Sequence, residues 1–451
     1  MRNRPAPYKS LHAWPLLLAC AAALLAFTHA QPRVHAQDQS QPAAGAGQTP
    51  SPAQPGTAPA SRTNRPRRPV FATYDDFRES LRAGTDAQVT KELAIPYKGI
   101  TATGALDPGL FPIRSTGVST EPVRKAAEAF LASLTPEQRA KTVYPIDDPQ
   151  WRRWNNVNTF VRQGVGMYQM TEDQREAGIN LLRASLSAKG LQLSRDVMRL
   201  SYTLGEETNR FSENGEWYYY ITVMGTPSAT QPWGWQIQGH HLIINYFILG
   251  DQVVMSPNFF GSEPTIATRG KYKGTSVLQD EQRMGLDLMR GLSDAQKKQA
   301  IIKVGVKTEN ENVGEAFKDN IVLDYKGVKA SGLSGDQKKQ LVALIARYVD
   351  NMDDGHAKIK MAEVQQHLDQ TYFAWIGASD ENSVFYYRIH SPVILIEYDH
   401  QQPIAMRDPP YDPNVPTRNH VHVVVRTPNG NDYGKDLLRE HYLAEPGTHA
   451  E

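Results

Sequence analysis

The sequence predicts an α+β protein whose helical and β-rich segments are segregated along the chain. Two blocks are dense in aromatic and β-branched residues and are broken by Gly, Pro and Asn turns, a composition typical of strands. Short connections within each block favour antiparallel pairing. Because helices and strands do not alternate one for one, we expect an antiparallel sheet packed by several capped helices and not a parallel α/β sheet.

The β-rich blocks divide into six predicted strand segments. The first block covers residues 216–223, 233–249 and 252–256, and the second covers 384–390, 393–399 and 419–427. Helical spacing fits residues 73–81, with Thr73 as the N-cap, and residues 120–134, with Pro122 in the first turn, where proline is tolerated.

A six-residue motif recurs four times: an apolar residue, Ser or Thr, two variable residues, Gln and a basic residue. The hydroxyl can accept hydrogen bonds from free N–H groups of a first helical turn, and an apolar residue before the cap can pack as a staple. We interpret the motif as four helix N-termini and not as a functional repeat. It begins at Leu134, Met170, Leu292 and Leu333.

The N-terminal region predicts export. Residues 1–36 have a basic start, an uncharged apolar run and small-residue cleavage patterns, which are typical of a signal peptide. We expect a periplasmic or secreted protein, with a lipoprotein anchored through Cys20 as a minor alternative. Residues 37–69 are rich in Pro, Gln and Ala and predict a disordered linker. Residues 70–451 are expected to form a single α+β domain.

Composition restricts the chemistry. Cys20 is the single cysteine, so a chain that has lost its leader has no disulfide and no thiolate. The formal net charge of +1 argues against nucleic acid as a partner. No later segment is long and apolar enough to predict a membrane helix. A small molecule is the expected partner, and the oligomeric state stays open.

Histidines in the strand blocks are the strongest chemical signal. Imidazoles on neighbouring strands can reach one ion, because residues two apart lie on the same face. Strand register favours His240 over His241, which shares its predicted face with Trp235 and Ile237 and is expected to be buried. The sequence therefore predicts a site for a divalent metal, zinc before copper or iron. Its predicted ligands are His240, His390, His420 and His422.

Charged residues on the same predicted face suggest catalytic roles. Glu397 would serve as a ligand, a general base or a partner of a ligand, while Arg388 and Arg426 would neutralise an acidic group of the substrate. A hydrolase and an oxidoreductase both fit this set, and so does a metal-free His/Arg site that binds anions. A non-catalytic extracytoplasmic protein for a small acidic ligand or glycan is the alternative, and purely structural histidines are the third interpretation.

Three segments resemble an uncharacterised family, domain of unknown function 3500. They are WQIQGHHL at 235–242 with SPNFFG at 256–261, YRIHSPVILIE at 387–397, and HVHVVVRTPNGNDYGKDL at 420–437. The resemblance extends over residues 70–443. It implies a shared fold in exported proteins but no established reaction and no catalytic residue.

Overall fold

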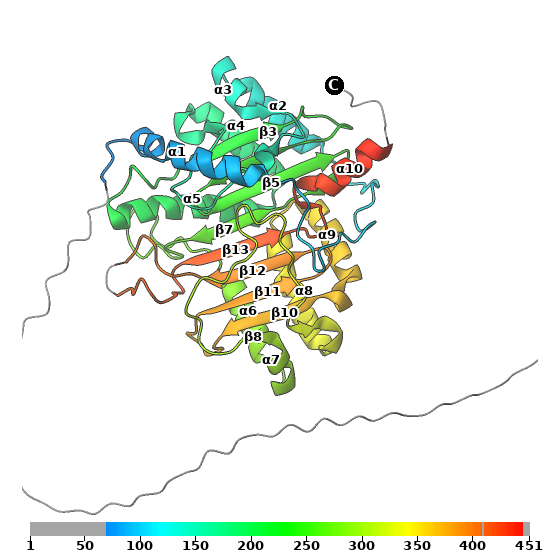
Figure 1. The fold of residues 1–451 in the computed structure, drawn as a ribbon. Coiled ribbons are helices and arrows are strands. Elements are labelled where there is room, and N and C mark those ends of the chain that lie inside the picture. Colours follow the sequence, from blue (N-terminus) through cyan, green and yellow to red (C-terminus); the bar gives the residue numbers. More distant parts are fainter. Residues whose placement is uncertain (1–68, 408–409, 445–451) are drawn as a thin grey trace, which may run out of the picture. The chain divides into compact units, whose positions relative to one another are not determined.

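Residues 69–407 and 410–444 are described by the structure, a computed structural model. The predicted leader, and all but the last residue of the predicted linker, lie outside them. The described residues build a 13-stranded sheet together with ten α-helices (Figure 1). The predicted α+β class is confirmed.

The sheet is mainly antiparallel. Its order is β1-β3-β4-β5-β7-β13-β12-β11-β10-β8, with β2, β6 and β9 as short additions to β3, β5 and β10. The strands are β1 (Val143–Tyr144), β2 (Val165–Gly166), β3 (Tyr220–Met224), β4 (Trp233–Gly239), β5 (Leu242–Leu249), β6 (Gln252–Val254), β7 (Asn258–Ser262), β8 (Ile301–Lys303), β9 (Val328–Lys329), β10 (Tyr372–Gly377), β11 (Phe385–His390), β12 (Leu395–His400) and β13 (Val421–Arg426).

One series of elements occurs twice along the chain. Residues 121–262, the first half, contain two helices, two short strands, a second helix pair and the strands β3 to β7. Residues 279–426, the second half, repeat this order without a described counterpart of β6 and end at β13. Sheet order reflects the repeat, because β7 and β13 meet antiparallel at the centre. In each half the first short strand pairs in parallel with the first long one, β1 with β3 and β8 with β10.

Helices from both halves cover one face of the sheet with apolar side chains. They are α2 (Glu121–Ser133), α4 (Glu172–Ser185) and α5 (Ala188–Thr208) in the first half, and α6 (Gln279–Arg290), α8 (Gly335–Val349) and α9 (Asp354–Gln366) in the second. Alternate strand residues such as Ile237, Tyr387 and Ile396 join this core. Because both sides of each interface are apolar, burial of this face supplies the main stabilisation.

The four predicted helix starts are confirmed. Thr135, Thr171, Ser293 and Ser334 are N-caps, and each forms a capping box with the Gln three residues later. They begin α3 (Pro136–Thr142), α4, α7 (Asp294–Ala300) and α8. The capping glutamines also bond across motifs, Gln138 with Gln174 and Gln296 with Gln337. The motif therefore joins two helix starts within each half.

The opposite face of the sheet is covered mainly by irregular segments, together with α1 (Tyr74–Leu93) and α10 (Lys435–Ala444). We call it the loop-covered face. Phe259, Val424 and Glu397 lie on it, and the first two pack against aromatic residues of the covering segments. Its charged strand residues are buried, Glu397 and Arg426 completely, instead of forming the open surface that the sequence suggested.

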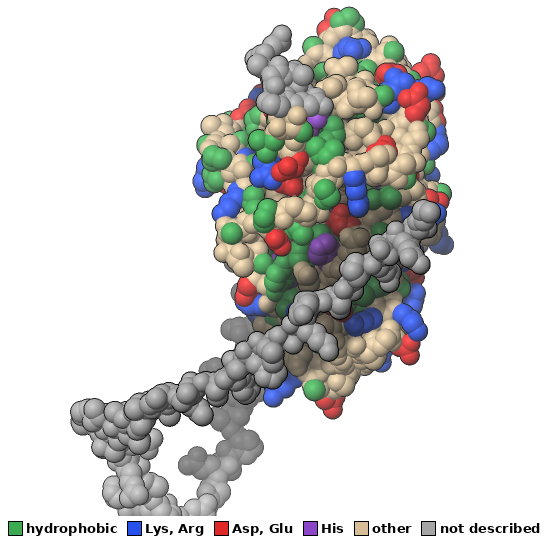
Figure 2. All heavy atoms as spheres, turned by 90° about the vertical axis from the view of Figure 1, so that its right-hand side faces the viewer, with side chains coloured by type: hydrophobic (Ala, Val, Ile, Leu, Met, Phe, Trp, Pro, Cys, Tyr) green, Lys and Arg blue, Asp and Glu red, His purple; other side chains and the backbone are tan. Residues whose placement is uncertain are grey.

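Several predicted boundaries change. The helix that starts after Thr73 runs to Leu93, and β7 and β10 were not foreseen. No described helix is long and apolar enough to cross a membrane. Figure 2 shows a face on which acidic and basic side chains are interspersed with apolar ones, in keeping with the small net charge.

Candidate metal centre

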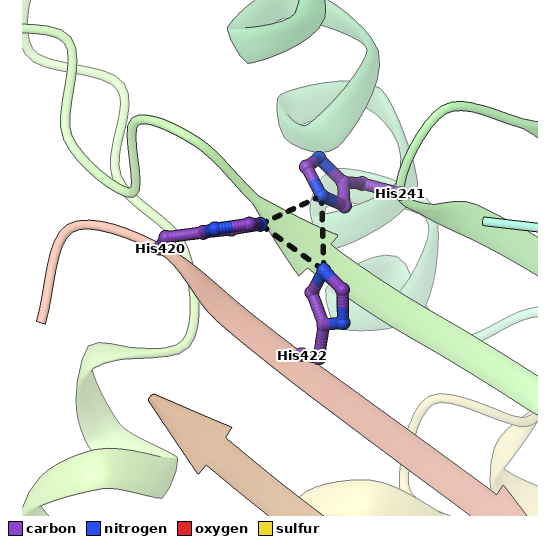
Figure 3. A group of neighbouring side chains, drawn as sticks. All are labelled: His241, His420 and His422. Carbon is purple, nitrogen blue, oxygen red and sulfur yellow. Dashed lines mark hydrogen bonds between the residues drawn. The ribbon is translucent and has the colours of Figure 1, made fainter. Parts of the chain in front are cut away.

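Three histidines converge at one end of the loop-covered face (Figure 3). The Nε2 atoms of His241, His420 and His422 form a nearly equilateral triangle. Its sides are 3.3 Å between His241 and His420, 3.2 Å between His241 and His422, and 3.1 Å between His420 and His422. All three side chains are buried, with exposed fractions of 5%, 2% and 7%.

A two-residue turn carries the first of these ligands. β4 and β5 pair as far as Gly239 and Leu242, so His240 and His241 form the connection. His241 has a φ of 60°, a left-handed conformation that is uncommon outside glycine but several-fold enriched for histidine. Its N–H donates to Asn156 O at 2.9 Å, and its carbonyl accepts from Gly261 N–H at 2.9 Å. These bonds hold a conformation that costs energy, as often occurs at functional sites.

The other two rings are oriented by hydrogen bonds through Nδ1. Nδ1 of His420 lies 2.7 Å from the carbonyl oxygen of Gln402, and Nδ1 of His422 lies 2.7 Å from a carboxylate oxygen of Glu315. Because both partners only accept, each Nδ1 carries the proton and each Nε2 presents a lone pair. Two such lone pairs 3.1 Å apart repel one another unless a cation lies between them.

The triangle matches the dimensions of a zinc site. With Zn–N bonds of about 2.0–2.1 Å, an ion would sit about 0.9 Å above the plane of the three nitrogens, at N–Zn–N angles of about 103°. These angles are near tetrahedral and leave a fourth position open. A square-planar ion needs one pair of ligands opposite each other, about 4 Å apart at the same bond length, which the triangle does not offer.

Burial keeps the rings of His241 and His420 neutral and therefore able to bind a cation. It lowers the pKa of His420 to about 4, and it lowers the pKa of His241 well below the usual value. Burial also acts to raise the pKa of Glu315, but its interactions with His422, Asn312 and His420 together outweigh burial, so the pKa of Glu315 falls. An ionised Glu315 strengthens the lone pair of His422, as carboxylate partners of metal-binding histidines do.

Glu397 and Arg426 hold the loop that presents Glu315. Glu397 accepts hydrogen bonds from the N–H groups of Val313 and Gly314, at 3.0 and 2.7 Å. Arg426 donates to Gly314 O at 2.9 Å and also bonds Asp432 and Asp319. The polar atoms of both side chains are thus engaged by the protein. Neither points at the triangle; instead they position the partner of His422.

A second buried glutamate holds the loop on the His420 side. Glu263, at the start of the segment after β7, accepts hydrogen bonds from the N–H groups of Ile404, Ala405 and Met406. This loop begins just after Gln402, whose carbonyl orients His420. A carboxylate oxygen of Glu263 also lies 3.9 Å from Nδ1 of His420. His420, just before β13, and His422, within β13, are therefore both oriented by loops that buried glutamates hold in place.

The structure separates the predicted ligands. It brings His420 and His422 together, with His241 in place of His240, because the strand ends at Gly239 and alternation does not extend into the turn. The ring of His240 stacks on that of His241 at 4.0 Å. His390 pairs with Leu395, four residues along β12 from the partner of His422, so it is displaced from His422 by roughly 13 Å along the strand direction and by two strands across the sheet.

The predicted substrate-binding arginines also have other partners. Arg388 lies across from Glu397 and donates to Asp324 O at 3.4 Å, whereas Arg426 belongs to a buried ion network. Sequence reasoning missed His241, Glu315 and Gln402. The adjacent histidines in the turn were a visible signal for His241, but nothing local marked a loop residue such as Glu315, which is 107 positions from His422.

Comparisons with known proteins leave the function open. No curated protein and no solved structure matches the chain. A family described as protein of unknown function, DUF3500, matches residues 116–435, which confirms the resemblance predicted from the three segments. Because the match extends over well more than half of the sequence, the chain belongs to the DUF3500 family.

Proposed function

We propose that this protein is a metal-dependent enzyme, with a zinc ion held by His241, His420 and His422. The observation that carries the proposal is the triangle of three Nε2 atoms, two of which present lone pairs to one point. Three neutral imidazoles and an open fourth position are typical of catalytic zinc, whereas structural sites fill all four positions.

Hydrolysis is the reaction class that this arrangement supports best. A zinc ion lowers the pKa of a bound water to about 7 and so supplies hydroxide as a nucleophile at neutral pH. The three histidines bring no charge that would weaken this effect. Oxidation chemistry would need a redox-active ion, and the near-tetrahedral angles favour zinc over square-planar copper.

Metal analysis of untagged protein tests the proposal. We expect about one zinc per chain after metal-replete expression, and His241→Ala, His420→Ala and His422→Ala variants that lose it. His240→Ala is the matched control, because its ring stacks on His241 but does not join the triangle. In cobalt-substituted protein we expect intense four-coordinate absorption that shifts with pH as bound water ionises. Wild-type protein without metal, or with a pH-independent cobalt spectrum, would count against an open catalytic site.

The leader supports a further proposal, that the enzyme acts outside the cytoplasm. Its basic start and apolar run are typical of exported proteins. Mass spectrometry of the mature chain from fractionated cells should find an N-terminus near residue 31 or 37. An intact Met1 in the cytoplasmic fraction would contradict export.

A further inference from the structure

A buried arginine without a counter-ion lies close to His241. Arg162 is 3% exposed, and among the described residues no carboxylate lies within 4.0 Å of it. Its guanidinium donates only to backbone carbonyls: Phe160 O at 3.0 Å, Asn155 O at 2.8 Å and Val157 O at 2.6 Å. Nε has no hydrogen-bond partner. Burial of a charge without a counter-ion costs several kcal/mol, so a bound anion would stabilise this guanidinium.

Backbone contacts place this guanidinium close to His241. Nη2 of Arg162 binds the carbonyls of Asn155 and Val157, on either side of Asn156. The carbonyl of Asn156 in turn accepts the N–H of His241. The positive charge of Arg162 is also near enough to contribute to the lowered pKa of both His240 and His241, although burial is the larger cause.

His240 adds a second unsatisfied group on this side. Its Nδ1 is buried and has no hydrogen-bond partner, while its ring stacks on His241. Arg162 and His240, each with an unpartnered side-chain nitrogen, are therefore both next to His241, Arg162 through the backbone around Asn156 and His240 through ring stacking. The other sides are occupied, because Glu315 and Gln402 already bond His422 and His420.

Resting on the proposed metal centre, we propose that Arg162 binds an anionic oxygen group of the substrate, a carboxylate or a phosphate, next to the metal ion. Charge favours this assignment. A divalent ion and Arg162 together exceed the negative charge of Glu315 and Glu263, the two described carboxylates within 4.0 Å of the three histidine rings. Asp399, across from His422, is paired with Lys307. An anion that spans the ion and the guanidinium would neutralise the excess, and charge-assisted bonds to arginine are strong and directional.

Anion binding to cobalt-loaded protein tests the inference. Acetate and inorganic phosphate are titrated while the visible cobalt spectrum is followed, and metal content is measured for every variant. We expect saturable spectral changes in the wild type and at least a ~10-fold weaker affinity in Arg162→Gln with its cobalt retained. Arg162→Lys, which keeps the charge, should fall between the two.

Arg388→Gln is the matched control. Arg388 is also 3% exposed, also donates to a carbonyl and also has an unpartnered Nε, but it lies away from the triangle. We expect its anion affinity to stay within about 2-fold of the wild type. Equal weakening in both variants would overturn the assignment of Arg162.

Other outcomes separate this inference from the proposed function. Wild-type protein that binds no cobalt would overturn the metal centre and this inference with it. Cobalt-loaded protein that binds neither anion, or Arg162→Gln with wild-type affinity, would overturn the inference alone. Loss of cobalt from Arg162→Gln would assign to Arg162 the positioning of His241 and would likewise overturn anion binding.

Discussion

The two halves of the molecule share a hairpin but differ in its turn. In the first half, β4 and β5 pair Trp235 with Tyr246, whose rings stack at 5.4 Å; in the second, β11 and β12 pair Tyr387 with Tyr398, stacked at 5.0 Å. Four residues beyond Trp235 and Tyr387, each hairpin closes in the same way. Gly239 pairs with Leu242, and Ser391 N–H donates to Ile394 O.

The turns themselves carry different chemistry. His240 and His241 occupy the first turn, whereas Pro392 and Val393 occupy the equivalent places in the second. His241 meets His420 and His422, while Val393 is fully buried among apolar side chains. The aromatic pairs are thus required by the fold, and the metal ligand is a property of one turn. Substitutions at equivalent positions of the two halves test this separation between residues required by the fold and residues that bind metal.

The largest effect on the free energy of unfolding is expected from Arg426, whose buried charge stabilises the fold. Arg426→Met leaves Asp432 and Asp319 without their buried partner, although Asp319 keeps a bond from Arg152 at 2.8 Å. Breaking a buried ion pair from one side typically costs about 3–5 kcal/mol. We expect a loss of that size in the free energy of unfolding of the metal-free protein, measured in urea. A loss below about 1 kcal/mol would show that the network is not what stabilises this region.

Equivalent turn positions should respond in opposite ways. His241→Ala should weaken zinc binding more than ~100-fold, beyond the 10–100-fold typical of groups that only orient a ligand. Val393→Ala should leave zinc affinity unchanged and lower the free energy of unfolding by about 1–3 kcal/mol, since it removes buried methyl groups. Competition with a chelating dye and urea unfolding measure the two quantities. Similar effects of both variants on zinc would abolish the distinction between the turns.

A smaller effect is expected from the loop of the second half that reaches the histidines. Glu315→Ala removes the acceptor that orients His422, and we expect zinc affinity to fall by about 10–100-fold. Glu309→Ala, an exposed change in the preceding part of the same segment, is the control and should have no effect on zinc. Unchanged affinity in Glu315→Ala would show that the carboxylate does not support the metal.

Periodic local signals explain what the sequence could predict. The Ser/Thr-x-x-Gln pattern identified four helix starts, because a capping box is made within four residues. Alternation identified the aromatic and aliphatic face of β11, because a buried face repeats every second residue. The α+β class followed from these two kinds of segment.

The site depended on non-local contacts. Strand alternation favoured His240 as the metal ligand. The two histidines instead form a two-residue turn, and with its positive φ His241 directs its own ring towards His420 and His422. The sequence singled out Glu397 and Arg426 as candidate catalytic charges. In the structure they instead bond loop residues more than 80 positions away, Glu397 to Val313 and Arg426 to Gly314. Irregular segments have no period from which such partners can be read.

The smallest expected effect concerns His390, which takes the place that Gln238 has in the first half. Burial, with a contribution from Arg388, lowers the pKa of His390 to about 3, and neither ring nitrogen has a partner. As the pH falls below about 6.5, His390 becomes protonated in the unfolded chain but stays neutral in the folded protein. The free energy of unfolding therefore falls as the pH falls. This group alone should remove about 2 kcal/mol between pH 7 and pH 5.

His390→Gln, which copies the residue of the first half, should abolish that part of the pH dependence. Urea unfolding of chelated wild type and variant at pH 7 and pH 5 measures it, because the difference between the two pH values is independent of any constant change in packing. Zinc content should stay at the wild-type level, since His390 lies outside the triangle. Equal pH dependence in both proteins would mean that His390 is protonated in the folded state. Loss of zinc from His390→Gln would show that His390 is a metal ligand after all.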